Sequence, residues 1–148
     1  MIRPTHISAP ASDGIDLASK TVQEAMQSSV AFCSAELPLE EIWQTMAERR
    51  LRFVIVVDGA ESPSTTWGVL SDLDLLAAAS VRNLCGQVAA GSAARPAVTI
   101  TPGETLRRAS QLMVEHDVAE LIVTDPLSNR PIGVLSTLDV VVALAPGH

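Results

Sequence analysis

Two stretches decide the fold of this chain: Gly68-Val69-Leu70-Ser71-Asp72-Leu73-Asp74 and, 65 residues later, Gly133-Val134-Leu135-Ser136-Thr137-Leu138-Asp139. An internal repeat indicates one supersecondary unit built twice, with each copy covering the apolar face of the other. The fold and any binding site are therefore expected in duplicate.

The similarity extends upstream of these stretches at a spacing of 67 residues. Residues 51–58 match 118–125, and the apolar positions of 39–46 match those of 106–113. The spacing changes only in the loop before Gly68 or Gly133, where a change of length is tolerated. We expect an N-terminal flexible arm over residues 1–20, a first copy over 21–84 and a second copy over 85–148.

Each copy is predicted to have the element order β-α-β-β-α, which gives a mixed α/β (α+β) fold. Residues 53–57 are apolar at every position, so this strand is expected in the middle of a sheet, covered on both faces. The other predicted strands are 30–34, 67–70, 97–100, 121–124 and 132–135, and the predicted helices are 39–50, 71–80, 105–115 and the segment from 136.

Composition excludes several classes of partner. The chain has 148 residues, is 47% hydrophobic and 18% charged, and carries a formal charge of −7. This charge argues against nucleic acid and against an anionic membrane surface. Residues 1–20 contain no signal-peptide pattern, and no apolar run reaches the ~20 residues that span a bilayer. We therefore predict a cytoplasmic protein, with Cys33 and Cys85 as reduced thiols.

The second helix of each copy is apolar almost all round. Its residues are Leu73, Leu75, Leu76 and Ala77–Ala79 in the first copy, and Leu138, Val140–Val142, Ala143 and Leu144 in the second. Packing within the chain covers one stripe of such a helix, and the remainder forms an exposed patch unless another subunit covers it. This pattern predicts a homodimer interface; the alternative is that both helices are enclosed within one chain.

A tandem β-α-β-β-α unit with Gly-x-x-Ser-x-x-Asp between its last strand and last helix resembles a pair of cystathionine-β-synthase (CBS) domains, often called a Bateman module. The resemblance covers about residues 20–145. It implies two repeats packed with pseudo-twofold symmetry. It also implies a regulatory role in binding an adenosine-containing ligand, with no catalytic residues.

The Ser-x-x-Asp element has two interpretations. Ser71 and Ser136 can be helix N-caps with Asp74 and Asp139 in the first turn, which requires no ligand. The same Asp can instead accept hydrogen bonds from the two hydroxyls of a ribose, as acidic residues do in dinucleotide-binding folds. Capping alone leaves the glycine three residues before each serine unexplained, and glycine there permits close approach to the strand backbone.

The resemblance implies roles for individual residues. Asp74 and Asp139 would hold the ribose, and Ser71 and Ser136 would contact ribose or phosphate. An apolar slot for adenine would be formed by Val54, Val69, Leu121 and Val134, with backbone from Thr99–Thr101 or the matching Phe32–Ser34. The family often has proline where this chain has Val54 and Leu121, which changes the expected shape of the slot.

Positive charge for a phosphate is clearest in the first copy; Arg107 and Arg108 of the second are either surface charges or reach across to the other copy's cleft. Arg49, Arg50 and Arg52 precede the second strand of the first copy, whereas the second copy has Glu120 in the matching region. We expect Arg52 to neutralise a phosphate in the first copy and Glu120 to repel one in the second. For each arginine, the alternative is a solvated helix end that favours cations.

The sequence contains no arrangement of Ser, His and Asp typical of a hydrolase, no phosphate-binding glycine-rich loop and no zinc spacing. The leading hypothesis is therefore a non-enzymatic regulatory module. It would form a homodimer, bind AMP, ADP, ATP or S-adenosylmethionine and act on a regulated protein partner. The alternative is a structural dimerisation module in which the motif only caps helices.

Overall fold

The computed structural model describes residues 16–57, 67–82 and 89–145. The first part of the chain forms α1 (Val22–Ala25), β1 (Phe32–Ser34), α2 (Leu39–Arg49), β2 (Phe53–Val57), β3 (Trp67–Ser71), α3 (Asp72–Ala77) and the π-helical turn η1 (Ala78–Arg82). The second part forms α4 (Ala90–Ala93), β4 (Arg95–Pro96), β5 (Thr99–Ile100), α5 (Leu106–His116), β6 (Glu120–Thr124), β7 (Pro131–Ser136) and α6 (Thr137–Leu144).

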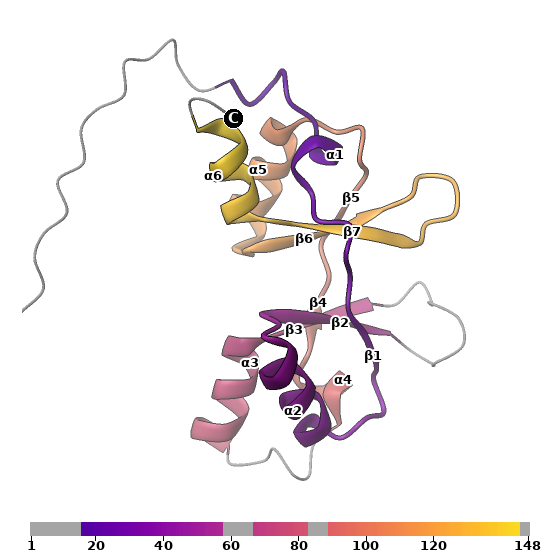
Figure 1. Cartoon of the computed structure of the whole chain (residues 1–148), viewed down its shortest axis with the longest axis vertical. Coiled ribbons are helices and arrows are strands. Elements are labelled where there is room, and N and C mark those ends of the chain that lie inside the picture. Colours follow the sequence, from indigo (N-terminus) through magenta and orange to yellow (C-terminus); the bar gives the residue numbers. More distant parts are fainter. Residues whose placement is uncertain (1–15, 58–66, 83–88, 146–148) are drawn as a thin grey trace, which may run out of the picture.

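The described residues form two sheets, with strand orders β1-β2-β3-β4 and β5-β6-β7. In each sheet the first strand is parallel to the second and the second is antiparallel to the third. The two sheets face each other across the middle of the molecule, and the longer helices cover their outer faces (Figure 1). The predicted β-α-β-β-α order and mixed α+β class are confirmed in both copies.

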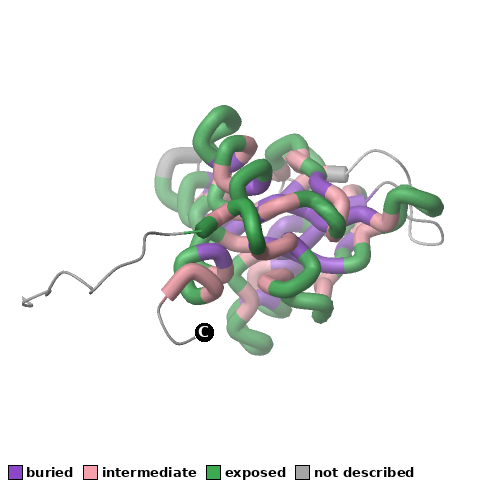
Figure 2. The backbone as a smooth tube through the Cα atoms, turned by 90° about the horizontal axis from the view of Figure 1, so that it is seen from above, coloured by how far each residue is buried: buried purple, intermediate pink, exposed green. Residues whose placement is uncertain are grey.

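Among the described residues, three apolar cores hold this arrangement together. One lies under the helices of the first copy and contains Leu39, Met46 and Leu70; another lies under those of the second and contains Leu106, Met113 and Leu135. The third lies between the sheets and consists of Ile55, Val57, Val69, Ile122 and Val134. Figure 2 shows the buried residues concentrated in the interior, with exposed residues around them. The middle strands are thus covered on both faces, as their continuous apolar runs predict.

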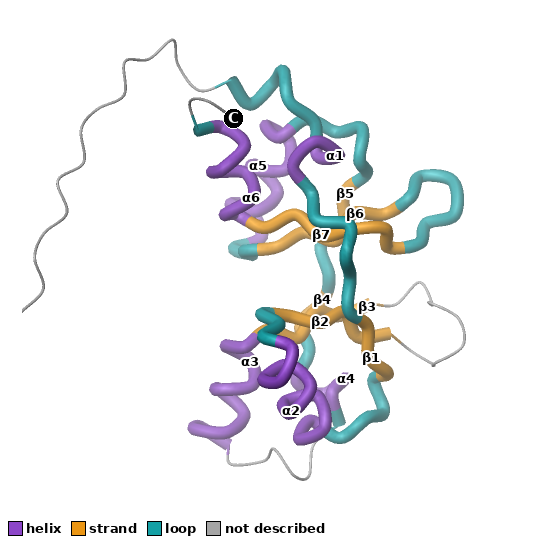
Figure 3. Tube along the Cα trace, in the orientation of Figure 1, coloured by secondary structure: helices purple, strands orange, loops and turns teal. Residues whose placement is uncertain are grey.

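The short helix at the start of each copy packs on the rest of the other copy. Val22 of α1 is fully buried in the core of the second copy, whereas Ala90 of α4 is fully buried in the core of the first. Backbone hydrogen bonds from Val22 N to Glu104 O (2.9 Å) and from Ala90 N to Leu37 O (2.8 Å) fix the two helices. The chain therefore crosses between the halves of the molecule, at 26–31 and at 94–98 (Figure 3).

The crossings explain the glycine of each motif. A Cβ on Gly133 would lie 2.7 Å from Gln27 O and 3.0 Å from Met26 Sδ. A Cβ on Gly68 would lie 2.9 Å from Ala94 Cβ and 3.1 Å from Arg95 O. Real Cβ atoms essentially never come within 3.0 Å of another atom, so only glycine leaves room for the crossing backbone.

Residues 16–20 differ from the loosely held arm that the sequence predicts. Leu17 packs against the core of the second copy, Leu106 N donates to Lys20 O (2.9 Å) and Arg107 N donates to Leu17 O (3.0 Å). These bonds satisfy N–H groups in the first turn of α5, which have no partner within the helix. Residues 1–15 of the predicted arm lie outside the described residues.

The helices α3 and α6 bury only one stripe each. Leu75 and Val140 are buried, whereas Leu76 is 56% exposed and Val141 is 63% exposed. Leu73, Leu138 and Val142 add to this exposed apolar surface. The two helices are therefore not enclosed within a single chain. Among the described residues, no helix is both long and apolar enough to cross a membrane.

Candidate functional site

Each motif begins its helix with a complete capping box. Ser71 N donates to Asp74 Oδ2 (2.8 Å) and Asp74 N donates to Ser71 Oγ (3.2 Å). In the second copy, Ser136 N donates to Asp139 Oδ2 (2.8 Å) and Asp139 N donates to Ser136 Oγ (3.1 Å). The capping interpretation of Ser-x-x-Asp is thus confirmed, but it uses only one carboxylate oxygen of each aspartate.

The second oxygen of each aspartate contacts a residue of a crossing segment. Asp74 Oδ1 forms an ion pair with Arg95 Nε at 3.3 Å, and Asp139 Oδ1 accepts a hydrogen bond from Gln27 Nε2 at 3.2 Å. Arg95 pairs with Val69 of β3, and Gln27 pairs with Val134 of β7, so the two residues occupy equivalent places in the two copies.

Sequence analysis missed both Arg95 and Gln27. At the repeat spacing of 67 residues, the residue equivalent to Arg95 would be Ser28. The strand pairing shows that the equivalent residue is Gln27. This shift by one residue lies in segments with little sequence similarity. The available signal was the motif glycine, which indicates that another backbone passes close to the strand.

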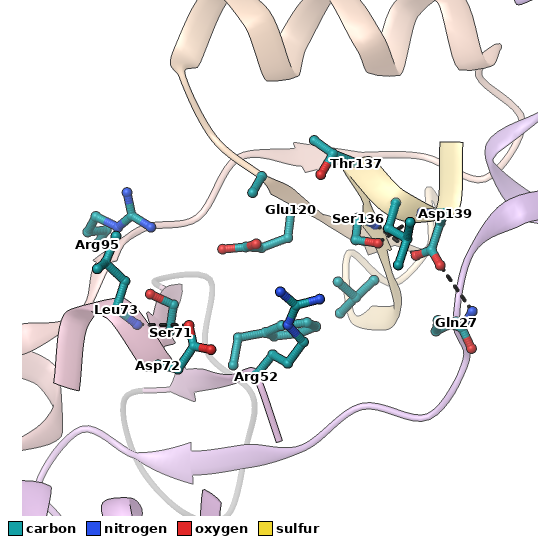
Figure 4. Close-up of a pocket in the computed structure, with 14 residues that line it drawn as sticks. Gln27, Arg52, Ser71, Asp72, Leu73, Arg95, Glu120, Ser136, Thr137 and Asp139 are labelled. Carbon is teal, nitrogen blue, oxygen red and sulfur yellow. Dashed lines mark hydrogen bonds between the residues drawn. The ribbon is translucent and has the colours of Figure 1, made fainter. Parts of the chain in front are cut away.

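A cavity of about 410 Å³ lies between the two motifs (Figure 4). Its volume is within the range of about 300–1,000 Å³ that is typical of small-molecule sites. Ser71, Asp72 and Leu73 line one side, and Ser136, Thr137 and Leu138 line the other. The remaining lining residues are Gln27, Arg52, Phe53, Arg95, Ala119, Glu120, Val134 and Asp139. The two motifs therefore share one continuous cavity.

Apart from Asp139, the charged residues that line this cavity lie near the first motif. Burial raises the pKa of the Glu120 carboxyl, Arg95 opposes the rise, and Asp74 and Asp72 add to it. Figure 4 shows the Glu120 side chain projecting into the space between the motifs. Glu120 belongs to the second sheet, but the charges that act on it come from residues in or beside the first sheet. The Glu120 carboxylate, which is expected to repel a phosphate, therefore lies near Asp74 and Arg52 of the first copy.

The structure brings together five of the ten predicted site residues as cavity lining: Arg52, Ser71, Val134, Ser136 and Asp139. Asp74 reaches the same region through its ion pair with Arg95, which itself lines the cavity. The neighbouring arginines, Arg49 and Arg50, are exposed at the end of α2 and are not among the lining residues.

The predicted adenine slot is not assembled as the sequence suggests. Val54 and Leu121 lie in the cores under the helices, and Val69 is buried between the sheets. Thr99 is exposed on β5 and is not among the cavity residues. Because successive side chains of a strand point to opposite faces, the cavity receives Phe53 and Glu120, the residues that precede Val54 and Leu121.

The family follows from comparison with known proteins. A family model described as the CBS domain matches residues 22–81 and 88–146. The chain belongs to the CBS-domain family. A search of curated proteins finds no match.

Solved structures share the fold of this CBS pair. A hexameric CBS-CP12 protein from bloom-forming cyanobacteria is 16% identical with a TM-score of 0.71, and the match covers 82% of this chain and 69% of that one. CBSX2 in complex with AMP is 23% identical with a TM-score of 0.67, covering 84% and 96%. The cytosolic domain of the Mg²⁺ channel MgtE in complex with ATP is 21% identical with a TM-score of 0.63, covering 80% and 46%.

The cavity offers no evident metal site. Within residues 16–57, 67–82 and 89–145, no group of three or more His, Cys, Asp or Glu side chains could hold a metal ion. The chemistry of the cavity is that of hydrogen bonding and charge, from serine hydroxyls, carboxylates and two guanidinium groups.

Proposed function

We propose that this CBS pair is a regulatory, non-enzymatic module that binds an adenosine-containing ligand in the cavity between its two motifs. The observation that carries the proposal is the duplicated aspartate. In each copy one carboxylate oxygen caps the helix, and the other contacts a residue of a crossing segment that lines the cavity. An acidic group in this position can accept hydrogen bonds from both hydroxyls of a ribose.

Ligand binding would act through the crossing segments. A ribose that takes the Oδ1 of Asp74 or Asp139 competes with Arg95 or Gln27, and these two residues belong to the backbone that links the halves of the molecule. A ligand shifts a conformational equilibrium by its differential affinity for the two states. The displaced segments would change how the halves sit, and a protein partner would sense that change.

The exposed apolar surface of α3 and α6 supports a homodimer. Val141→Glu places a charge on this surface, so we expect the variant to move toward the monomer in size-exclusion chromatography with light scattering. Leu127→Glu is the control, because Leu127 is 95% exposed in the turn between β6 and β7. Unchanged mass for Val141→Glu, or an equal change for Leu127→Glu, would refute this interface.

Isothermal titration calorimetry with AMP, ADP, ATP and S-adenosylmethionine tests the binding function. A charge-assisted hydrogen bond contributes about 1.5–3 kcal/mol, so Asp139→Asn is expected to weaken binding about ten- to a hundredfold. Asp117→Asn is the control: Asp117 is exposed and has a φ of 52°, a conformation that asparagine accepts. Equal affinity of Asp139→Asn and Asp117→Asn would exclude Asp139 from the site.

The second candidate is a structural dimerisation module with no nucleotide. The complete capping boxes favour it, because they give Ser71, Asp74, Ser136 and Asp139 a role without a ligand. A thermal-shift screen separates the two candidates. Binding to the native state must raise its apparent stability, so no shift with any of these ligands at millimolar concentration supports the structural role.

A further inference from the structure

The two halves of the cavity carry different charges although the motifs match. The first motif has Asp72 where the second has Thr137, and the residue before the middle strand is Arg52 in the first copy and Ala119 in the second. Arg95 contacts the first aspartate, and the uncharged Gln27 contacts the second. A duplicated scaffold has therefore become an asymmetric site.

The acidic groups of this site outnumber the basic ones. Arg52 and Arg95 are the cations among the described lining residues, and Arg95 is already in an ion pair with Asp74. Asp72, Glu120 and Asp139 are the lining carboxylates. With Arg95 paired, Arg52 is the remaining lining cation against three lining carboxylates, so the cavity has no excess of positive charge to offer a phosphate.

Glu120 is the residue that decides this balance. It is half-buried on β6, at the position equivalent to Phe53 on β2, and projects into the cavity between the motifs (Figure 4). The groups that face it are Arg52, which precedes β2, Asp72 and Asp74 on α3 and Arg95 on β4. Burial already opposes its negative charge, and a phosphate nearby would oppose it further.

We infer that Glu120 makes this cavity select adenosine compounds whose 5′ substituent is neutral or cationic, such as a sulfonium or ammonium group, over those that end in phosphate. The inference rests on the proposed function and names the ligand class of the same site. A cation beside Glu120 and Asp72 is attracted by both carboxylates in a region where solvent only partly screens their charges, whereas a phosphate is repelled there.

Two matched pairs of probes test the inference by isothermal titration calorimetry on the full chain. S-adenosylmethionine differs from S-adenosylhomocysteine by one methyl group and one positive charge, and AMP differs from adenosine by its phosphate. We expect S-adenosylmethionine to bind about tenfold more tightly than S-adenosylhomocysteine, and adenosine more tightly than AMP. Added salt should weaken the binding of S-adenosylmethionine and strengthen that of AMP.

Glu120→Gln keeps the size of the side chain and removes its charge. This variant should bind AMP about tenfold more tightly than the wild type and should lose the preference for S-adenosylmethionine. Glu115→Gln is the matched control, because Glu115 is exposed on α5 outside the cavity. Thermal melting of both variants verifies that they fold.

The outcomes separate the two levels of the proposal. Tighter binding of AMP than of adenosine, with the same affinities in Glu120→Gln, would refute the charge selection and leave adenosine binding intact. Binding of none of the four probes would refute the proposed function, and the selection with it. Preference for S-adenosylmethionine that persists in Glu120→Gln would refute the role of Glu120.

Discussion

The crossing of the two halves can be tested at Gly133. Gly133→Ala places a Cβ 2.7 Å from Gln27 O, a backbone atom that cannot rotate away. Ordinary van der Waals contact begins at 3.4 Å, so the crossing segment must move by several tenths of an ångström. The hydrogen bonds between Gln27 and Val134, at 2.8 and 2.9 Å, hold it against that movement.

Overpacking a well-filled site costs about 1–3 kcal/mol, and we expect Gly133→Ala to lower the free energy of unfolding by this amount. Gly103→Ala is the matched control, because a Cβ on Gly103 meets nothing within 4 Å. The control should be neutral or gain about 0.4–1 kcal/mol, since alanine restricts the unfolded chain. Urea unfolding followed by circular dichroism measures both variants.

The difference between the two variants is the informative quantity, because both make the same chemical change. A Gly133→Ala variant within about 0.5 kcal/mol of Gly103→Ala would refute the close crossing. Gly68→Ala should fall between them, because its closest contact is the Ala94 Cβ at 2.9 Å and the nearest backbone atom, Arg95 O, is at 3.1 Å.

Three further measurements test the cavity and the core. Burial raises the pKa of Glu120, so its contribution to stability is present below the ordinary pKa of 4.5 and is lost as the pH rises through the raised pKa. We therefore expect Glu120→Gln to raise the free energy of unfolding at pH 7 but not at pH 4, as measured by urea unfolding. Arg95→Ala removes a half-exposed ion pair and should cost at most about 1 kcal/mol by the same method. Burial raises the pKa of the Cys33 thiol to about 11, so in a Cys85→Ser variant a thiol reagent at pH 8 should react with Cys33 only after unfolding.

The repeat made most of the fold predictable from sequence. Matching apolar runs placed β2 and β6, and the helical periodicity of residues 39–50 and 105–115 placed α2 and α5 to within a residue or two. Both of these helices also end at matching residues in the left-handed conformation, Arg50 and Asp117. A pattern that occurs twice supports each assignment with independent evidence.

The exchange of the first helices was not predictable in this way. Val22 and Ala90 are apolar residues in short segments, and periodicity shows that such residues are buried without showing which core buries them. The motif glycines indicated that another segment of backbone passes close to the strand, but they did not show which segment it is. The partners of Asp74 and Asp139 depend on that exchange, and for this reason Arg95 and Gln27 were missed.

Val54 and Leu121, two residues of the predicted adenine slot, do not line the cavity because of the strand face on which they lie. The sequence shows that Val54 and Leu121 are in strands, and a central strand that is apolar on both faces does not reveal which face meets the cavity. The observed faces put Phe53 and Glu120 there instead. Glu120 is the more informative of the two, because burying a carboxylate on a strand costs free energy unless another group compensates its charge.

The residues that line the shared cavity differ between the two copies, whereas the capping geometry of the motifs does not. Ser71 and Ser136, with their aspartates, keep the same capping geometry to within 0.1 Å in each hydrogen bond compared. The residues around them differ in charge at every equivalent pair that carries a charge: Arg52 and Ala119, Phe53 and Glu120, Asp72 and Thr137, Arg95 and Gln27. Capping geometry constrains the scaffold because each helix start needs it. The surrounding charges are under no such constraint, so they can specialise one shared cavity for one ligand whose two ends differ.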